Sequence, residues 1–148
     1  MTILDTYPKQ YLYHRVVRAK LFIDEHYASR LHLDDIADEA CFSKFHFARL
    51  FRTIYGRTPH QYLIHVRVEN ARLLLESGEP VARACYAVGF DSITSFTGLF
   101  KRRVGLTPAA YQLMESQRKD EIRSRPLKFV PNCFVEKQGL DKIAIFEK

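Results

Sequence analysis

Two stretches of the sequence carry lysine and arginine but neither aspartate nor glutamate, and they span residues 40–68 and 92–114. Their basic residues are Lys44, Arg49, Arg52, Arg57 and Arg67 in the first stretch and Lys101, Arg102 and Arg103 in the second. Segregated positive charge on a chain of net charge +6 indicates an anionic polymer as the partner. The alternative interpretation is two basic faces that are only solvated.

The same short motif occurs in both stretches. Residues 47–62 have the sequence FARLFRTIYGRTPHQY, and residues 96–111 have the sequence FTGLFKRRVGLTPAAY. The residues that recur 49 positions later are Phe47, Leu50, Phe51, Gly56, Thr58, Pro59 and Tyr62, which match Phe96, Leu99, Phe100, Gly105, Thr107, Pro108 and Tyr111. Upstream, Ile36 and Ala37 match Ala84 and Cys85 at an offset of 48, so one copy has an extra residue in a turn. A fixed repeat near this length predicts a duplicated supersecondary unit.

Each copy is predicted to form a short helix, a tight turn and a longer helix, which is the helix-turn-helix pattern. The expected helices cover residues 14–27, 33–40, 44–54, 59–77, 81–88, 93–104 and 108–118. We therefore expect an all-α fold with two helix-turn-helix subdomains joined by a long helix. The expected segments are an N-terminal arm (1–13), the first subdomain (14–57), the linker helix (58–77), the second subdomain (78–118) and a tail (119–148).

Residues at the ends of these helices support the boundaries. Ser43 and Ser92 precede the two longer helices, where a hydroxyl can accept a hydrogen bond from an otherwise unpaired backbone N–H. Gly56 follows the first of them and is expected in the left-handed conformation that ends a helix, and Gly105 is expected to end the second. The Thr-Pro pair at 58–59 predicts the start of the linker helix.

Helical spacing separates a core face from an outer face on each longer helix. The expected core residues are Phe47, Leu50, Phe51, Ile54 and Tyr55 on the first, and Phe96, Leu99, Phe100 and Val104 on the second. The expected outer residues are Lys44, Phe45, Ala48, Arg49 and Arg52 on the first, and Ile93, Thr94, Thr97, Gly98 and Lys101 on the second. The core residues repeat and the outer residues differ, as two helices that contact different base sequences would require.

An α-helix fits the major groove of DNA, where all four base pairs can be distinguished. Arg49 can bond to guanine O6 and N7, Phe45 and Ile93 can contact thymine methyls, and Thr94 and Thr97 can contact bases or phosphate. The residues expected at phosphates are Ser43, Arg52, Arg57, Ser92, Lys101, Arg102 and Arg103. Alternatively, Arg49 is a solvated surface residue and Phe45 closes the edge of the core. Gly98 either permits a close approach of the backbone or marks weak base contact by the second unit.

Several classes of protein are disfavoured by composition. The hydrophobic fraction is 47%, with 11 Phe and 8 Tyr, which is enough for a core. We expect neither a signal peptide in MTILDTYPKQ nor a membrane span. Three widely spaced cysteines suit a reducing cytoplasm. The histidines lack ligand spacing, CxxC pairs are absent, and no nucleophile motif occurs, so we expect no metal site, no cofactor and no enzyme. The expected location is the cytoplasm, at the nucleoid.

The tail has a different composition from the rest. Residues 127–135 (LKFVPNCFV) and 142–146 (KIAIF) are short β-prone runs around a turn-type glycine. Pro131 would confine the first run to a sheet edge or a bulge.

The run from Leu31 to Gln112 resembles the DNA-binding domain of the AraC/XylS family of bacterial transcription regulators. The pieces that carry the resemblance are LHLDDIADEACFSKFHFARLFRTIYGRTPHQYL, VRVENARLLLESGEP and VARACYAVGFDSITSFTGLFKRRVGLTPAAYQ. The resemblance implies seven helices, with two recognition helices (about 44–54 and 93–104) entering adjacent major grooves on one side of the DNA. It places base contacts at Lys44, Phe45, Ala48, Arg49, Ile93, Thr94, Thr97 and Gly98. Many members have arginine at the position of Gly98.

The resemblance also bears on partners. It implies double-stranded DNA as the partner, allows RNA polymerase as a second one, gives no role to a membrane, and leaves any small-molecule effector unidentified. About a dozen residues precede the first expected helix, so we expect no sensor domain there, and the tail is a candidate for the start of an effector domain. The alternatives are a non-specific or architectural DNA-binding protein, and a sensor or interaction module that acts through the tail.

Overall fold

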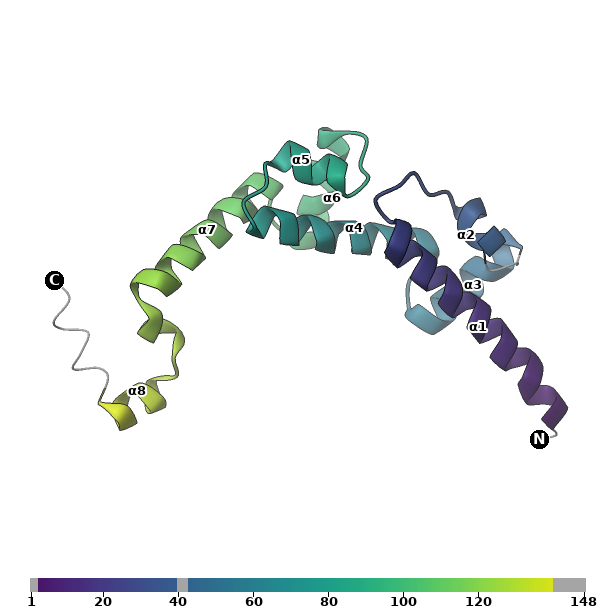
Figure 1. The fold of residues 1–148 in the computed structure, drawn as a ribbon, viewed down its shortest axis with the longest axis horizontal. Coiled ribbons are helices and arrows are strands. Elements are labelled where there is room, and N and C mark those ends of the chain that lie inside the picture. The colour runs from purple at the N-terminus through teal and green to yellow at the C-terminus, as the bar shows by residue number, and fades with distance from the viewer. Residues whose placement is uncertain (1–2, 40–42, 140–148) are drawn as a thin grey trace. The chain divides into compact units, whose positions relative to one another are not determined.

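The structure is a computed structural model that describes residues 3–39 and 43–139, and all regular elements among these residues are helical (Figure 1). The elements are α1 (Ile3–His26), α2 (Leu33–Glu39), α3 (Lys44–Tyr55), α4 (Pro59–Glu76), α5 (Val81–Ala87), α6 (Ile93–Val104), α7 (Pro108–Ser124), the 3-10 turn η1 (Pro126–Phe129) and α8 (Asn132–Gln138). The predicted all-α fold is therefore confirmed.

The first compact unit extends through Pro108 and contains both predicted helix-turn-helix pairs. Helices α1, α2 and α3 contact one another and α4, while α5 contacts both α4 and α6 (Figure 1). The core under α3 consists of Val16, Ala19, Ile23, Ile36, Ala37, Phe47, Phe51 and Leu63. In the second pair, Ala84, Cys85 and Val88 are fully buried, as are Phe96 and Phe100. Each longer helix is thus fixed by two buried phenylalanines one turn apart.

The turn between the paired helices explains the two repeat offsets. Helix α5 begins 48 residues after α2, whereas α6 begins 49 residues after α3. The extra residue of the second copy therefore lies between α5 and α6, where a loop accommodates it without changing the face of either helix.

The ends of the two longer helices are alike at the C-terminus and differ at the N-terminus. Gly56 (φ 70°) is left-handed and Gly105 ends α6, as predicted; Gly105 (φ 91°) is left-handed too, and the two backbone N–H groups donate to Arg52 O and Lys101 O. The Ser92 hydroxyl accepts from Ser95 N at 3.4 Å. Ser43 occupies the N-cap position of α3, but its side chain makes no capping hydrogen bond, so the prediction that its hydroxyl caps this helix was wrong. Ser43 is exposed, so solvent can satisfy its hydroxyl.

The start of α4 is capped by Thr58, as predicted, and Gln61 adds a reciprocal hydrogen bond. The Thr58 hydroxyl accepts from Gln61 N at 3.2 Å, and the Gln61 side chain accepts from Thr58 N at 3.0 Å. Pro59 follows as the first helical residue. This reciprocal pair satisfies two backbone donors that an uncapped helix start would leave unbonded. It fixes where the linker helix begins, directly after the turn that ends α3.

Helices α1 and α7 are longer than predicted. Helix α1 begins at Ile3 rather than near residue 14, and α7 reaches Ser124 rather than residue 118. The apolar periodicity marked only the packed part of each helix, and a helix end can continue beyond its packed part because its backbone hydrogen bonds are internal.

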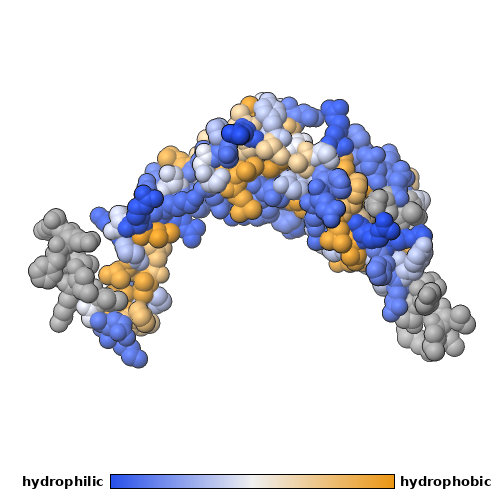
Figure 2. Space-filling view, viewed as in Figure 1, coloured by the Kyte–Doolittle hydropathy of each residue, from blue (hydrophilic) through white to orange (hydrophobic). Residues whose placement is uncertain are grey.

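Residues 127–135 are not strands. They form most of η1, the link at Pro131 and the first half of α8, so the β-strand prediction for this run was wrong. Two isolated strands are marginal in water, and local helical turns satisfy backbone groups without a partner strand. Figure 2 shows hydrophobic residues gathered on this segment, where Phe129 and Phe134 are half exposed. The second β-prone run, 142–146, lies outside the described residues.

Candidate nucleic-acid interface

The outer face of α3 presents an aromatic residue and basic side chains to solvent. Phe45 is 80% exposed, which excludes the alternative that it closes the edge of the core. Arg49 and Arg52 are exposed, and Ala48 is half-buried. Ile54, which was expected in the core, is 37% exposed, so that expectation was wrong. The face therefore offers a cation and an apolar ring side by side, and both can reach base edges in a groove.

Lys44 has a partner that the sequence did not reveal. Its ammonium Nζ lies 3.3 Å from Asp34 Oδ1 of α2, and both side chains are largely exposed. An exposed ion pair of this kind stabilises a protein by about 0–1 kcal/mol. Lys44 can therefore leave Asp34 for another anion at little cost.

The outer face of α6 is smaller and less charged. Ile93 is 39% exposed, Thr94 and Gly98 are exposed, and Thr97 is half-buried. A Cβ built at Gly98 would meet nothing within 4 Å, so the protein itself does not require glycine at this position. Because Gly98 has no side chain, the helix backbone itself forms the surface between Thr94 and Lys101.

The residues expected at phosphates lie around the ends of these two helices. Ser43 and Ser92 are at the N-termini of α3 and α6, and Lys101, Arg102 and Arg103 are exposed in the last turn of α6. Arg52 is exposed near the end of α3, whereas Arg57 is half-buried in the turn that follows it. Arg57 is thus the least exposed of the basic residues in this set.

A junction between the two helix-turn-helix pairs was missed by the sequence analysis. From α4, Arg67 donates through Nε to Tyr27 O at 2.7 Å and through Nη2 to Ser29 O at 2.8 Å. Its guanidinium carbon also lies 5.7 Å from the centre of the Phe90 ring, in the turn between α5 and α6. Burial lowers the pKa of Arg67, and nearby Asp91 partly opposes this effect. One side chain thus contacts segments of both pairs.

The backbone approaches itself closely at the same junction. Gly89 has φ +96°, and a Cβ placed there would lie 2.8 Å from Ala28 O, so only glycine fits without a shift. Arg30 and Asp91 add an ion pair at 3.4 Å, with side chains 78% and 83% exposed. Because exposed pairs contribute little, the junction depends on Arg67 and Gly89. The only sequence signals were a glycine in a turn and an arginine on an otherwise apolar stretch of α4.

A second polar contact joins α1 to the linker helix. The Tyr62 hydroxyl donates to Asp24 Oδ1 at 2.8 Å, and Lys20 Nζ lies 2.6 Å from Asp24 Oδ2. The hydrogen bond to Asp24 raises the pKa of Lys20, and burial raises the pKa of Tyr62. These contacts fix α1 against α4, and both of these helices contact α3.

The part of the chain that the structure describes contains no group of three or more His, Cys, Asp or Glu residues able to hold a metal ion. Within the same residues, none of the helices combines the length and apolar character needed to cross a membrane.

Comparison with known proteins identifies the family. A family model described as a helix-turn-helix domain matches residues 36–114, more than half of the chain. The chain belongs to the AraC/XylS family of transcription regulators. The family and the fold of its DNA-binding module are those of regulators rather than of enzymes. The resemblance seen in the sequence is therefore confirmed, and the family match covers residues 36–114.

Curated relatives of this AraC/XylS-type chain are also regulators. It is 41% identical over 92 residues to the MmsAB operon regulatory protein of Pseudomonas aeruginosa, which covers 62% of this chain and 30% of that protein. It is 32% identical over 107 residues to the HTH-type transcriptional activator AarP of Providencia stuartii, which covers 72% of this chain and 79% of that protein. The chain spans about a third of the length of several such curated relatives.

Solved structures agree with the fold. The DNA-binding domain of AdpA, a global transcriptional factor crystallised in complex with a target DNA, superposes with a TM-score of 0.64 at 30% identity and covers 75% of this chain and 96% of that one. A regulator from Chromobacterium violaceum with an AraC-type domain gives a TM-score of 0.64 at 25% identity, covering 70% of this chain and 93% of that one.

Proposed function

We propose that the chain is a sequence-specific DNA-binding module that inserts α3 and α6 into adjacent major grooves. The observation that supports this most is the pairing of a repeated interior with divergent outer faces. Phe47, Phe51, Phe96 and Phe100 are all fully buried, whereas the exposed residues of the two helices differ in size and charge. Similarity to the AdpA domain, which was crystallised with its target DNA, points to the same ligand.

The two helices take different roles in this proposal. Lys44, Phe45, Ala48 and Arg49 contact base edges from α3, and Arg49 selects a guanine through its two-pronged guanidinium. Helix α6 presents fewer side chains that can distinguish bases. Its base contacts come from Ile93, Thr94 and Thr97, with Gly98 allowing a close approach.

Contacts to the sugar-phosphate backbone position the module without specifying sequence. We assign them to Ser43, Arg52, Arg57, Ser92, Lys101, Arg102 and Arg103. The uncapped hydroxyl of Ser43 suits this role, because it has no bond to α3 to give up. If about six phosphates are neutralised, the logarithm of the binding constant should fall with the logarithm of salt concentration at a slope of about −5.

In-vitro selection of bound duplexes from a random pool tests the proposal directly. We expect an asymmetric motif that spans about two helical turns, because one chain supplies two recognition helices and adjacent major grooves lie about 34 Å apart. Footprinting should protect both grooves with one chain per site. Recovery of a pool with no enriched sequence would contradict specific recognition and favour an architectural role, while a slope near zero would contradict DNA binding itself.

A further inference from the structure

A cavity of about 350 Å³ opens beside α4, between the turn after α3 and the end of α6. Arg57 lines it from the turn between α3 and α4, and Arg103 lines it from the end of α6. The α4 contribution is His65, Val68, Glu69 and Arg72. The volume lies within the range of small-ligand sites, and Val68, which is 2% exposed, gives the cavity an apolar wall. The turn before α4, α4 itself and the more distant end of α6 therefore line one cavity.

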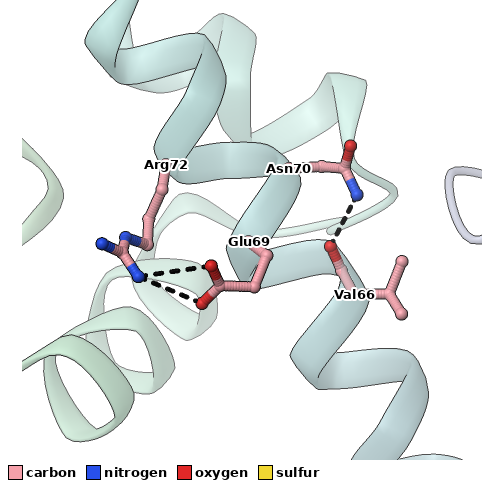
Figure 3. Close-up of polar contacts among 4 residues, drawn as sticks. All are labelled: Val66, Glu69, Asn70 and Arg72. Atoms are coloured by element: carbon pink, nitrogen blue, oxygen red, sulfur yellow. Dashed lines mark hydrogen bonds and ion pairs between the residues drawn. The ribbon is translucent and has the colours of Figure 1, made fainter.

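The charges around this cavity do not balance. Among the described residues that line it, three are arginines and Glu69 alone is acidic. The Glu69 carboxylate is already bound by Arg72, whose Nη1 lies 3.3 and 3.2 Å from its two oxygens (Figure 3). Figure 3 also shows the Asn70 side chain donating to Val66 O, with no bond drawn to Glu69. No described carboxylate lies within ion-pair distance of Arg57 or Arg103.

His65 lies among these cations and responds to them. Burial lowers its pKa most, the charge of Arg57 lowers it further, Glu69 raises it, and Arg103 lowers it slightly. The remaining neighbours are Arg72, which is neutralised by Glu69, and the Tyr62 ring, whose centroid lies 6.5 Å away. A neutral imidazole retains one N–H donor, and an added negative charge would favour its protonated form.

We propose that this cavity binds an oxyanion, a phosphate or a carboxylate, between Arg57, Arg103 and His65. Guanidinium groups match both anions through paired N–H donors, and such charge-assisted bonds are stronger than neutral ones. The Glu69 carboxylate is paired with Arg72 and does not neutralise Arg57 or Arg103. The bound anion would neutralise these two arginines. The same chemistry has two sources: a free small anion, or a backbone phosphate of bound DNA. The proposal does not depend on sequence-specific recognition by α3 and α6.

The test uses the full chain in the absence of DNA. Inorganic sulfate is the probe, because sulfate stays fully ionised over the pH range in which His65 titrates. Sulfate replaces chloride at constant ionic strength, and the ring protons of His65 are followed by NMR from pH 5 to 8. We expect saturable binding that raises the pKa of His65. Binding should be tighter at low pH, because the anion favours the protonated imidazole. A linear, non-saturating response would overturn the proposal.

Charge-matched variants separate the site from general electrostatics. Arg57→Gln combined with Arg103→Gln should weaken sulfate binding about tenfold or more, the loss expected for removing charge-assisted hydrogen bonds. The control combines Arg83→Gln with Arg123→Gln, two exposed arginines outside the cavity, and should bind sulfate as the unaltered chain does. Equal binding by the two double variants would overturn the site. Circular dichroism and thermal unfolding of both variants verify that each is folded.

A final titration identifies the source of the anion. A duplex carrying the selected sequence is added to the sulfate-bound chain. Loss of the His65 response on DNA binding assigns the cavity to a backbone phosphate. A response that persists in the complex assigns it to a free small anion, and a sulfate-dependent change in DNA affinity would make that anion an effector. If the duplex fails to bind while sulfate still does, the DNA interface is wrong and the cavity proposal stands.

Discussion

The two recognition helices are alike inside and different outside. The phenylalanines at equivalent positions are all 0% exposed, in α3 (Phe47, Phe51) and in α6 (Phe96, Phe100). The outer face of α3 carries Phe45, which is 80% exposed, and the guanidinium of Arg49. The outer face of α6 carries Ile93 and, at Gly98, no side chain. A close-packed interior tolerates few changes of volume, whereas an exposed face is constrained only by what it binds. The difference therefore marks which residues maintain the fold and which determine binding.

The largest effects should come from the shared interior. Phe51→Ala and Phe100→Ala each remove a fully buried ring, so each should lower the free energy of unfolding by about 3–5 kcal/mol. Urea denaturation followed by circular dichroism measures both. Similar losses would confirm that the two helices have equivalent cores. A loss below about 1 kcal/mol for either variant, well under the range for such truncations, would contradict that equivalence.

The next effect concerns Gly89, where the second pair meets the loop after α1. Gly89→Ala should cost about 1–2 kcal/mol for the left-handed backbone, plus a further loss because its Cβ would lie 2.8 Å from Ala28 O. Gly78→Ala is the matched control, since Gly78 has φ +92° and open space around its Cβ position. Thermal unfolding compares their stabilities, and binding to the selected two-groove site tests whether the junction sets the spacing of α3 and α6. Equal behaviour of the two variants would show that the close approach is unimportant.

A more selective effect, on DNA binding rather than on stability, is expected on the outer face of α3. Arg49→Ala should weaken binding to the selected site by about 1–3 kcal/mol and relax the preference at one base pair. Arg52→Ala should instead weaken binding to all duplexes alike, because a phosphate contact carries no sequence information. Repeating the selection with each variant distinguishes the two roles. An unchanged motif for Arg49→Ala would show that Arg49 is a solvated surface residue.

The repeat predicted more of this structure than single residues did. Two copies of the same buried pattern, each followed by a left-handed glycine, defined α3, α6 and their boundaries, because those features are local in sequence. The Arg67 and Gly89 contacts were not predictable, since they join segments about 40 and 60 residues apart. The β-propensity of residues 127–135 was misleading because propensity decides little where no partner strand is available. The cavity was hidden for a similar reason, because Arg103 comes from a segment that is far from Arg57 and His65 in the sequence.

The smallest effect should come from Gly98, and it sharpens the comparison most. Gly98→Ala should raise the stability of the chain by about 0.5–1 kcal/mol, because glycine inside a helix costs conformational entropy and a Cβ here meets nothing within 4 Å. The fold therefore does not require glycine at position 98, and a reason for glycine there must lie in DNA binding.

Two possible results of DNA titrations show how Gly98 affects binding. If the backbone of α6 stands clear of the bases, Gly98→Arg should raise affinity and sharpen the half of the motif under α6, since a guanidinium there can select a guanine as Arg49 does under α3. If the backbone lies against the DNA, Gly98→Ala should already weaken binding despite the more stable helix. Unfolding and DNA titrations of the two variants separate these cases. A more stringent half-site under α6 than under α3 in the unaltered chain would contradict the division of roles between the two helices.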